Sequence, residues 1–277
     1  MTNWLSKAFR SKKRKKPSAP RSQPIPTAGA DLGIIVDVGL HLGEDAEYYA
    51  RRGYTVIGYE ANPDLCEIAA KKLEGLDVEI KNAAVSDTPD SEVTFFVNTK
   101  IPVWSSLDRT LGERGSGARE ITVKTIDLAK DLAPVADKLH YVKIDIEGYD
   151  FVALSQLMSL DARPPYLSLE GSSEELLDYL FAQGYREFQL VNQKFVQHQK
   201  VKPDSPHGAY LDWDFSFGSS GTFGEDLPGK WLSIEDAKRV STAIVKGFEI
   251  APGNLFAEAV GWFDLHAKHG SASGSSS

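Results

Sequence analysis

The chain has 277 residues, 42% hydrophobic and 25% charged, which suits one large α/β domain or a domain with an added cap. No apolar run approaches the roughly 20 residues that a membrane helix needs, no signal-peptide pattern appears, and a single cysteine excludes an intrachain disulfide, so we expect a cytoplasmic location. Residues 1–30 hold eight basic residues and no acid. The remainder of the chain therefore has 23 basic and 39 acidic residues, a formal charge of −16. Such a charge makes a poor surface for nucleic acid.

The two ends of the chain are predicted to lie outside the folded domain. Residues 1–30 are expected to be a disordered arm, because basic residues and prolines dominate it. Within residues 1–16, the apolar side chains Trp4, Leu5, Ala8 and Phe9 share one helical face ahead of the basic cluster, which is typical of a weak peripheral membrane anchor. A solvated tail explains the same pattern equally well. Residues 266–277 are expected to be a flexible tail, so the domain is predicted to span 31–265.

The first predicted strand, residues 33–38, carries Asp37 near its end and precedes a turn with Gly39 and Gly43. Glycine lets the backbone approach a ligand where a Cβ would collide, and the helix that begins at Glu44 places free N–H groups beside the turn. These features predict a nucleotide-cofactor pocket. The spacing is Gly-x-x-x-Gly rather than Gly-x-Gly-x-x-Gly, and the missing middle glycine argues against a nicotinamide enzyme.

The second predicted strand, residues 54–60, ends in Glu60. A carboxylate at this position can accept hydrogen bonds from both ribose hydroxyls, a role that dinucleotide-binding folds share with enzymes that use S-adenosyl-L-methionine (SAM). The structural alternative is that Glu60 merely caps the helix that begins at Pro63.

Strands and helices alternate over most of the remaining chain, which predicts an α/β fold with a mainly parallel central sheet and helices on both faces. Ligands bind at the carboxyl ends of the strands in such sheets, and Asp37, Glu60, Asp145 and Glu170 all fall at predicted strand ends. The predicted strands are 33–38, 54–60, 77–82, 92–98, 120–124, 139–145, 165–170 and 185–191.

The alternation stops at about residues 197–232, an aromatic-rich segment that we interpret as a cap or insertion. Its Asp212-Trp213-Asp214 piece would suit a sugar, with an aromatic plate for the C–H face and acids for the hydroxyls. The alternative is that the aromatic side chains pack the cap onto the sheet. A helix near 233–247 would serve either a symmetric dimer or the domain's own core, so the oligomeric state stays open.

Six pieces of the chain, in this order and spacing, resemble the FkbM-type SAM-dependent methyltransferases over roughly residues 33–195. The most recognisable is Lys143-Ile144-Asp145-Ile146-Glu147-Gly148, and one departure is His41, where the family more often has Asn. The resemblance implies a Rossmann-like class I methyltransferase fold, SAM as cofactor and O-methylation of hydroxyls. The other pieces are Asp37-Val38-Gly39-Leu40-His41-Leu42-Gly43, Tyr59-Glu60-Ala61-Asn62-Pro63, Asn82-Ala83-Ala84-Val85-Ser86-Asp87, Ser105-Ser106-Leu107 and Val123-Lys124-Thr125-Ile126-Asp127-Leu128.

The resemblance also implies which residues bind SAM. The turn from Asp37 to Gly43 would hold the methionine part, Glu60 the ribose hydroxyls, and residues at the following strand ends the adenine. The full implied set is Asp37, Gly39, His41, Gly43, Glu60, Asn62, Asn82, Ala83, Ser105 and Asp145.

Asp145 is the leading candidate for catalysis, because it lies at a strand end next to a glycine. It could orient the SAM amino group, accept a proton from the acceptor hydroxyl, or ligate a metal. Glu170 ends the next strand, and the two carboxylates could share a Mg²⁺ ion that polarises a hydroxyl. His41 could act as general base, since its ordinary pKa lies near working pH. For Lys143 and Glu147, a structural ion pair is an equally good interpretation.

We therefore expect a SAM-dependent O-methyltransferase that acts on a hydroxyl of a carbohydrate or of a glycosylated or natural-product small molecule. Two alternatives remain at this point: a nicotinamide-dependent oxidoreductase and a non-catalytic SAM-binding scaffold. The expected partner is a small-molecule or glycan acceptor, with no nucleic acid and with membrane contact only through residues 1–16.

Overall fold

The computed structural model describes residues 32–250 and 260–274. The predicted arm, its proposed membrane-binding residues 1–16 and the last three residues of the predicted tail lie outside the described residues. Within the described ranges, no helix is both long and apolar enough to cross a membrane.

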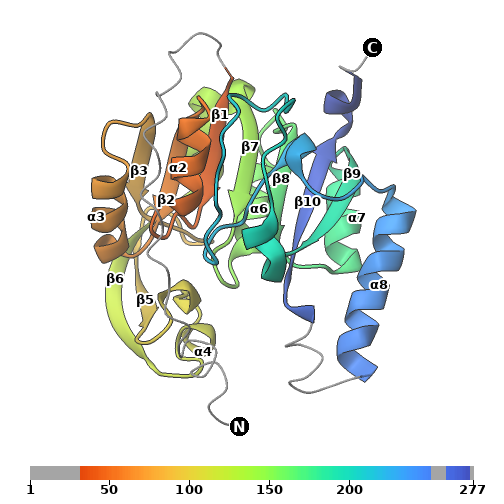
Figure 1. Cartoon of the computed structure of the whole chain (residues 1–277). Coiled ribbons are helices and arrows are strands. Elements are labelled where there is room, and N and C mark those ends of the chain that lie inside the picture. The colour runs from red at the N-terminus through yellow and green to blue at the C-terminus, as the bar shows by residue number, and fades with distance from the viewer. Residues whose placement is uncertain (1–31, 251–259, 275–277) are drawn as a thin grey trace, which may run out of the picture.

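The central sheet of the described residues has seven strands, and their mainly parallel direction agrees with the alternation of strands and helices along the chain (Figure 1). Pairing is parallel throughout except for one strand, β10, which runs antiparallel to both of its neighbours. The prediction of a mainly parallel α/β fold is confirmed. From one edge to the other the strands are β3 (Val78–Asn82), β2 (Thr55–Glu60), β1 (Ile34–Val38), β7 (Leu139–Ile144), β8 (Tyr166–Glu170), β10 (Phe263–His269) and β9 (Tyr185–Asn192).

Helices cover both faces of this sheet, because successive strand side chains point to opposite sides. Val36 and Val38 join one apolar cluster, whereas Ile35, between them, joins the other. The first cluster is closed by α5 (Leu128–Leu132), α6 (Asp150–Leu157), α7 (Glu174–Ala182) and α8 (Ile234–Ile250). The second is closed by α2 (Glu44–Arg51), α3 (Pro63–Lys72) and the segment from 196 to 223.

Two predicted strands belong to a separate sheet beyond one end of the first (Figure 1). β5 (Glu92–Asn98) and β6 (Ala118–Ile126) pair antiparallel, and the short β4 (Ala84–Val85) lies parallel to β6. Because their pairing is antiparallel, β5 and β6 form a hairpin-like pair rather than a parallel crossover unit. The connection between them holds a 3₁₀ turn, η1 (Pro102–Trp104), and α4 (Arg109–Gly112).

The predicted flexible tail from residue 266 is wrong over 266–269, because these residues belong to β10. Leu265 and Ala267 are fully buried in the sheet between β8 and β9. The alternation of polar and apolar side chains in this strand was a signal for it, but the glycine- and serine-rich end that follows directly led to its assignment to a tail. A 3₁₀ turn, η5 (Gly270–Gly274), comes after it.

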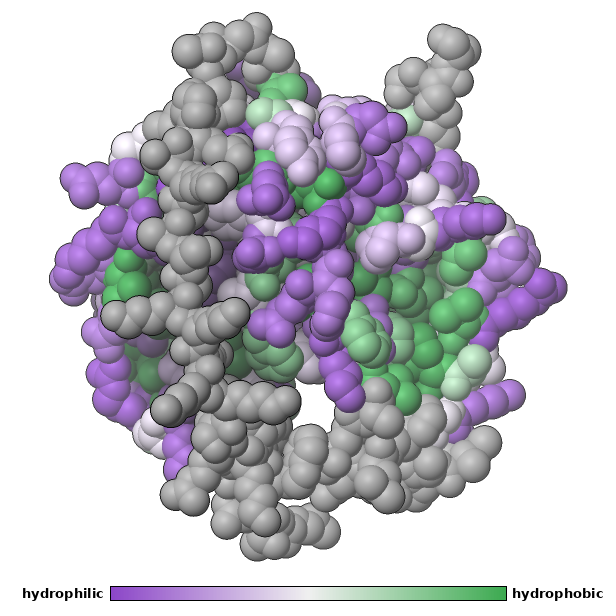
Figure 2. Space-filling view, viewed as in Figure 1, coloured by the Kyte–Doolittle hydropathy of each residue, from purple (hydrophilic) through white to green (hydrophobic). Residues whose placement is uncertain are grey.

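The predicted cap over about 197–232 crosses in front of β1 and β7 (Figure 1) and has little regular structure beyond the 3₁₀ turns η3 (Gln193–His198) and η4 (Gly224–Asp226). A fully buried ion pair between Arg52 and Asp226 fastens it to the end of α2. The ring of Phe223 stacks on Tyr141 of the sheet, with centroids 4.5 Å apart. On this face, hydrophobic side chains gather toward the side of β9 and α8 (Figure 2).

Candidate cofactor and acceptor site

The turn after β1 is so tight that only glycine fits at its first position. Gly39 has φ +97°, and a Cβ there would lie 2.0 Å from the carbonyl oxygen of Asp145. The N–H groups of Gly39 and Leu40 donate to the carbonyl of Tyr59 at 3.0 and 2.9 Å. The turn therefore brings the ends of β1, β2 and β7 together, as a ligand site at strand ends requires. Gly43, with φ +70°, then begins α2 as its N-cap.

Glu60 is buried at the end of β2, and its carboxylate is held by two backbone donors. One oxygen accepts the N–H of His41 and the other that of Asn62, each at 2.8 Å. Burial raises the pKa of Glu60, and the two N–H groups act in the opposite direction. Each oxygen keeps a lone pair for a further donor. The N-cap of α3 is Asn62, whose side chain accepts from Asp64 at 3.0 Å, so the capping role considered for Glu60 falls to another residue.

Asn82 stabilises the same loop from the neighbouring strand. Its side-chain amide donates to the carbonyls of Glu60 and Ala61 at 2.9 and 3.1 Å. Ala83 follows it and is buried. The structure thus gathers Glu60, Asn62 and Asn82 at the ends of β2 and β3.

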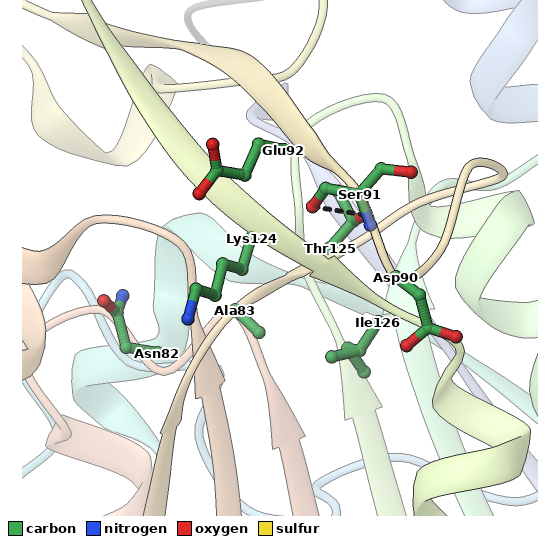
Figure 3. A pocket seen from close by; sticks show the side chains of 8 residues that line it. All are labelled: Asn82, Ala83, Asp90, Ser91, Glu92, Lys124, Thr125 and Ile126. Carbon is green, nitrogen blue, oxygen red and sulfur yellow. Dashed lines mark hydrogen bonds between the residues drawn. The ribbon is translucent and has the colours of Figure 1, made fainter.

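A hollow of about 500 Å³ lies next to Asn82 and Ala83, on the side of β5 and β6 (Figure 3). Neither Glu60 nor Asp145 lines it, so the hollow borders the site without containing its central carboxylates. Its other lining residues are Asp90, Ser91, Glu92, Lys124, Thr125 and Ile126.

Lys143 is buried at the centre of three carboxylates. Its ammonium lies 3.0 Å from Asp37 Oδ1 and 3.9 Å from both Asp45 Oδ2 and Asp145 Oδ2. Although burial acts to lower the pKa of Lys143, these carboxylates raise it well above the ordinary value, so the side chain is charged. The considered pairing with Glu147 is wrong, because β7 ends at Ile144 and Glu147 pairs with Arg114 at 2.7 Å instead.

The ion pair belongs to a polar row that crosses the sheet. Register pairs place Asp37 beside Lys143, Lys143 beside Ser168, and Ser168 beside His266, all on the face under the cap. Among the described residues, Asp37 Oδ2 and His266 Nε2 are buried without a hydrogen-bond partner. Sequence reasoning missed Ser168 and His266, although polar residues at every second position of β8 and β10 were a signal. Asp45 was also missed, and a lone acid in a helix gives no such signal.

Carboxylates gather one row closer to the strand ends, where Asp145, Glu170 and Asp264 lie. Asp264 stands opposite Glu170 in the register of β10 and β8. Partial burial and the negative charge of Asp145 raise the pKa of Glu170 to about 8, although its side chain still contacts solvent. The charge of Asp145 therefore acts on Glu170, as expected for two residues at the ends of adjacent strands. Within the described ranges, no group of three or more potential ligands is arranged to hold a metal ion, so the predicted Mg²⁺ gains no support.

Two further predicted residues have local partners. His41, with φ +52°, lies in the turn with Nδ1 3.3 Å from Glu44 Oε2. The hydroxyl of Ser105 donates to Pro102 O at 2.7 Å, within its own loop. Its neighbour Ser106 is fully buried, and its hydroxyl donates at 2.6 Å to the carbonyl of Glu147 in the site loop, residues 145–149 between β7 and α6.

The solved structures most similar in shape include several methyltransferases, all distant. Precorrin-6y C5,15-methyltransferase from Geobacter metallireducens GS-15 is 10% identical, with a TM-score of 0.36 and alignment over 86% of this chain and 79% of that one. A SAM-dependent methyltransferase from Archaeoglobus fulgidus is 14% identical, with a TM-score of 0.36 over 85% and 86% of the two chains. At TM-scores below 0.5, these likenesses carry no argument about this chain. No curated protein matches the chain.

A family comparison is decisive where the structural ones are not. The model of the methyltransferase FkbM domain matches residues 37–187, more than half of the chain. The match begins at Asp37 in the cofactor turn and ends within β9, so it covers the glycine turn, Glu60, Asp145 and Glu170. The predicted SAM-dependent methyltransferase is supported at this level, and the chain belongs to the FkbM family of methyltransferases.

Proposed function

We propose that this protein transfers a methyl group from SAM to a hydroxyl of a carbohydrate or of a glycosylated or natural-product small molecule. The observation that carries the proposal is the carboxylate of Glu60, held by two backbone N–H groups beside a turn that contacts the end of β7. Two spare lone pairs on a fixed carboxylate fit the two hydroxyls of a ribose. Bound SAM would supply an electrophilic methyl group on a sulfonium.

In this proposal the chain's residues divide into two sets. Around Glu60, the turn residues Asp37, Gly39, His41 and Gly43 hold the methionine part, and Asn62, Asn82 and Ala83 border the adenine. Ser105 is assigned only to the loop that closes the site, since its hydroxyl is bonded within that loop.

The second set handles the acceptor. Asp145 and Glu170 stand at the ends of β7 and β8, where a carboxylate could orient a hydroxyl and remove its proton. The pKa of Glu170, raised to about 8, suits this carboxyl to exchange a proton with a hydroxyl near neutral pH. Asp145 is the better candidate for orienting the SAM amino group, because Lys143 holds it close to the cofactor turn. His41 is a third candidate base.

The first test is calorimetric titration of the full chain with SAM and with S-adenosylhomocysteine. We expect micromolar binding that Glu60→Ala weakens by at least about 100-fold, since two charge-assisted hydrogen bonds are lost. Glu67→Ala removes an exposed acid on α3 and should leave binding unchanged. Repeating the titration with EDTA tests the metal, for which we expect no effect on cofactor affinity.

Two outcomes would count against the proposal. If the wild-type protein binds neither compound but binds NAD, the glycine turn belongs to an oxidoreductase. If it binds SAM but transfers no tritiated methyl group to any acceptor in a panel of methyl glycosides and hydroxylated aromatic compounds, the protein is a SAM-binding scaffold.

A further inference from the structure

Two large aromatic rings remain half exposed at the carboxyl end of the sheet. Phe217 of the cap is 50% exposed and Trp262, just before β10, is 39% exposed. Their ring centroids are 5.4 Å apart and the rings are nearly perpendicular, at 73°. Other aromatic residues of the same cap are buried against the domain, Phe215 at 4% and Phe223 at 0% exposure. Packing of the cap therefore does not account for the exposed pair.

Phe217 is held beside the cofactor turn by a well-bonded loop. The N–H of Ser220 donates to both oxygens of Asp45 in α2, at 3.1 and 2.9 Å. Within the loop, the N–H of Ser219 donates to the carbonyl of Ser216 at 3.2 Å. A Cβ on Gly218 would lie 3.6 Å from Glu44, the first residue of α2. The ring thus projects from a loop fixed at the start of the helix that follows Gly43.

Trp262 is fixed from the opposite side, next to the acceptor carboxylates. Its carbonyl accepts the N–H of Gln193 at 2.9 Å, and the carbonyl of the following residue accepts the N–H of Gly171 at the same distance. Gly171 directly follows Glu170, and Asp264 pairs with Glu170 in register. The aromatic pair therefore spans from the cofactor turn to the end of β8.

We propose that Phe217 and Trp262 form the acceptor-binding wall of the enzyme, on which the C–H face of a sugar ring packs while Glu170, the exposed carboxylate at the end of β8, accepts hydrogen bonds from its hydroxyls. Aromatic faces carry negative charge and attract weakly positive C–H groups, and rigid rings lose little entropy on binding. The inference rests on the proposed function and specifies its acceptor.

The alternative sugar plate considered from the sequence, Asp212-Trp213-Asp214, is engaged elsewhere. The ring of Trp213 packs 5.9 Å from Tyr48, on the middle of α2, and Asp214 pairs with Lys200 at 2.6 Å. These contacts place it away from the strand ends and leave the pair at 217 and 262 as the aromatic surface next to the carboxylates.

The test measures tritiated methyl transfer from SAM to methyl glycosides of glucose, galactose, mannose and rhamnose. For the best glycoside, we expect Phe217→Ala and Trp262→Ala each to raise KM by about tenfold, with kcat changed less than about threefold. Trp262→Phe keeps an aromatic face and should recover most of the affinity, which separates stacking from misfolding. Tyr210→Ala is the matched control, because Tyr210 is 51% exposed in the same cap but follows Ala209, which binds Arg52 at the far end of α2.

The affinity for S-adenosylhomocysteine, measured on every variant, keeps the two proposals distinguishable. If the wild-type protein does not bind S-adenosylhomocysteine, the proposed function is refuted. Unchanged cofactor affinity with an unchanged glycoside KM in both alanine variants would refute the wall alone. So would a wild-type protein that binds the cofactor and methylates hydroxylated aromatic compounds but none of the glycosides.

Discussion

The two aspartates beside Lys143 differ in burial, and this difference gives them different roles. Lys143 contacts both Asp37, which is almost fully buried, and Asp145, whose side chain is 45% exposed. Neutralising a buried partner leaves a charge uncompensated in a low-dielectric surrounding, whereas water screens the loss of an exposed one. The two aspartates should therefore respond differently to the same change.

We predict that Asp37→Asn lowers the free energy of unfolding by about 3–5 kcal/mol, and that Asp145→Asn changes it by less than about 1 kcal/mol. Asp145→Asn should instead lower kcat by about 100-fold or more if it acts on the acceptor or the SAM amino group. Urea unfolding and single-turnover methyl transfer measure the two effects. Full activity of Asp145→Asn would remove this residue from the catalytic set.

At the scale of elements, the cap and the sheet are joined by a buried aromatic cluster that contains two histidines. His140 Nε2 of β7 lies 3.3 Å from His207 Nδ1 of the cap, and both rings pack around Phe223. Burial lowers the pKa of each to about 4, below the ordinary 6.5. Below pH 6.5 the unfolded chain takes up protons that the folded chain does not. The stability that depends on neutral histidines is thus complete above pH 6.5 and is lost as the pH falls toward 4.

We predict that His140 and His207 each contribute a loss of unfolding free energy between pH 6.5 and 4, of up to about 1.4 kcal/mol per pH unit. The raised pKa values of Asp45 and Glu170 act in the opposite direction, so the prediction concerns the difference between variants. His140→Phe should remove the contribution of one histidine and so change the slope of unfolding free energy against pH by up to about 1.4 kcal/mol per pH unit. Comparing slopes cancels any constant cost of the substitution. His198→Gln, at an exposed site, is the control and should keep the wild-type slope. Identical slopes in all three proteins would show that the buried pair does not govern acid sensitivity.

The elements also show where prediction from sequence succeeds. The strands β1, β7 and β8 are predicted within one residue of their observed ends. β10 is missed and its last residues are assigned to a tail, because its burial comes from neighbours far away in sequence, on β8 and β9. The separation of β5 and β6 into a second sheet is likewise decided by pairing, which the strand pattern does not contain.

For the whole molecule, the uneven charge of the chain suggests a role for the arm. Eight basic residues in 1–30 stand against a formal −16 in the rest. We predict that the full chain binds vesicles containing anionic lipid and that removing residues 1–30 abolishes this binding while sparing methyl transfer to a soluble acceptor. Vesicle co-sedimentation at low and high salt measures it, with zwitterionic vesicles as control. Equal partition of the truncated protein would show that the arm is not an anchor.

The sequence by itself determined the α/β alternation, the glycine turn, and the carboxylates at strand ends, because these depend on local backbone geometry and on periodicity. It also carried the family resemblance that the match over residues 37–187 confirms. Only the tertiary structure decided that Lys143 pairs with Asp37 rather than Glu147, that Ser106 rather than Ser105 reaches the site loop, and that β10 lies between β8 and β9. Each of these depends on which distant segments pack together, and a pattern read along one chain does not specify such contacts.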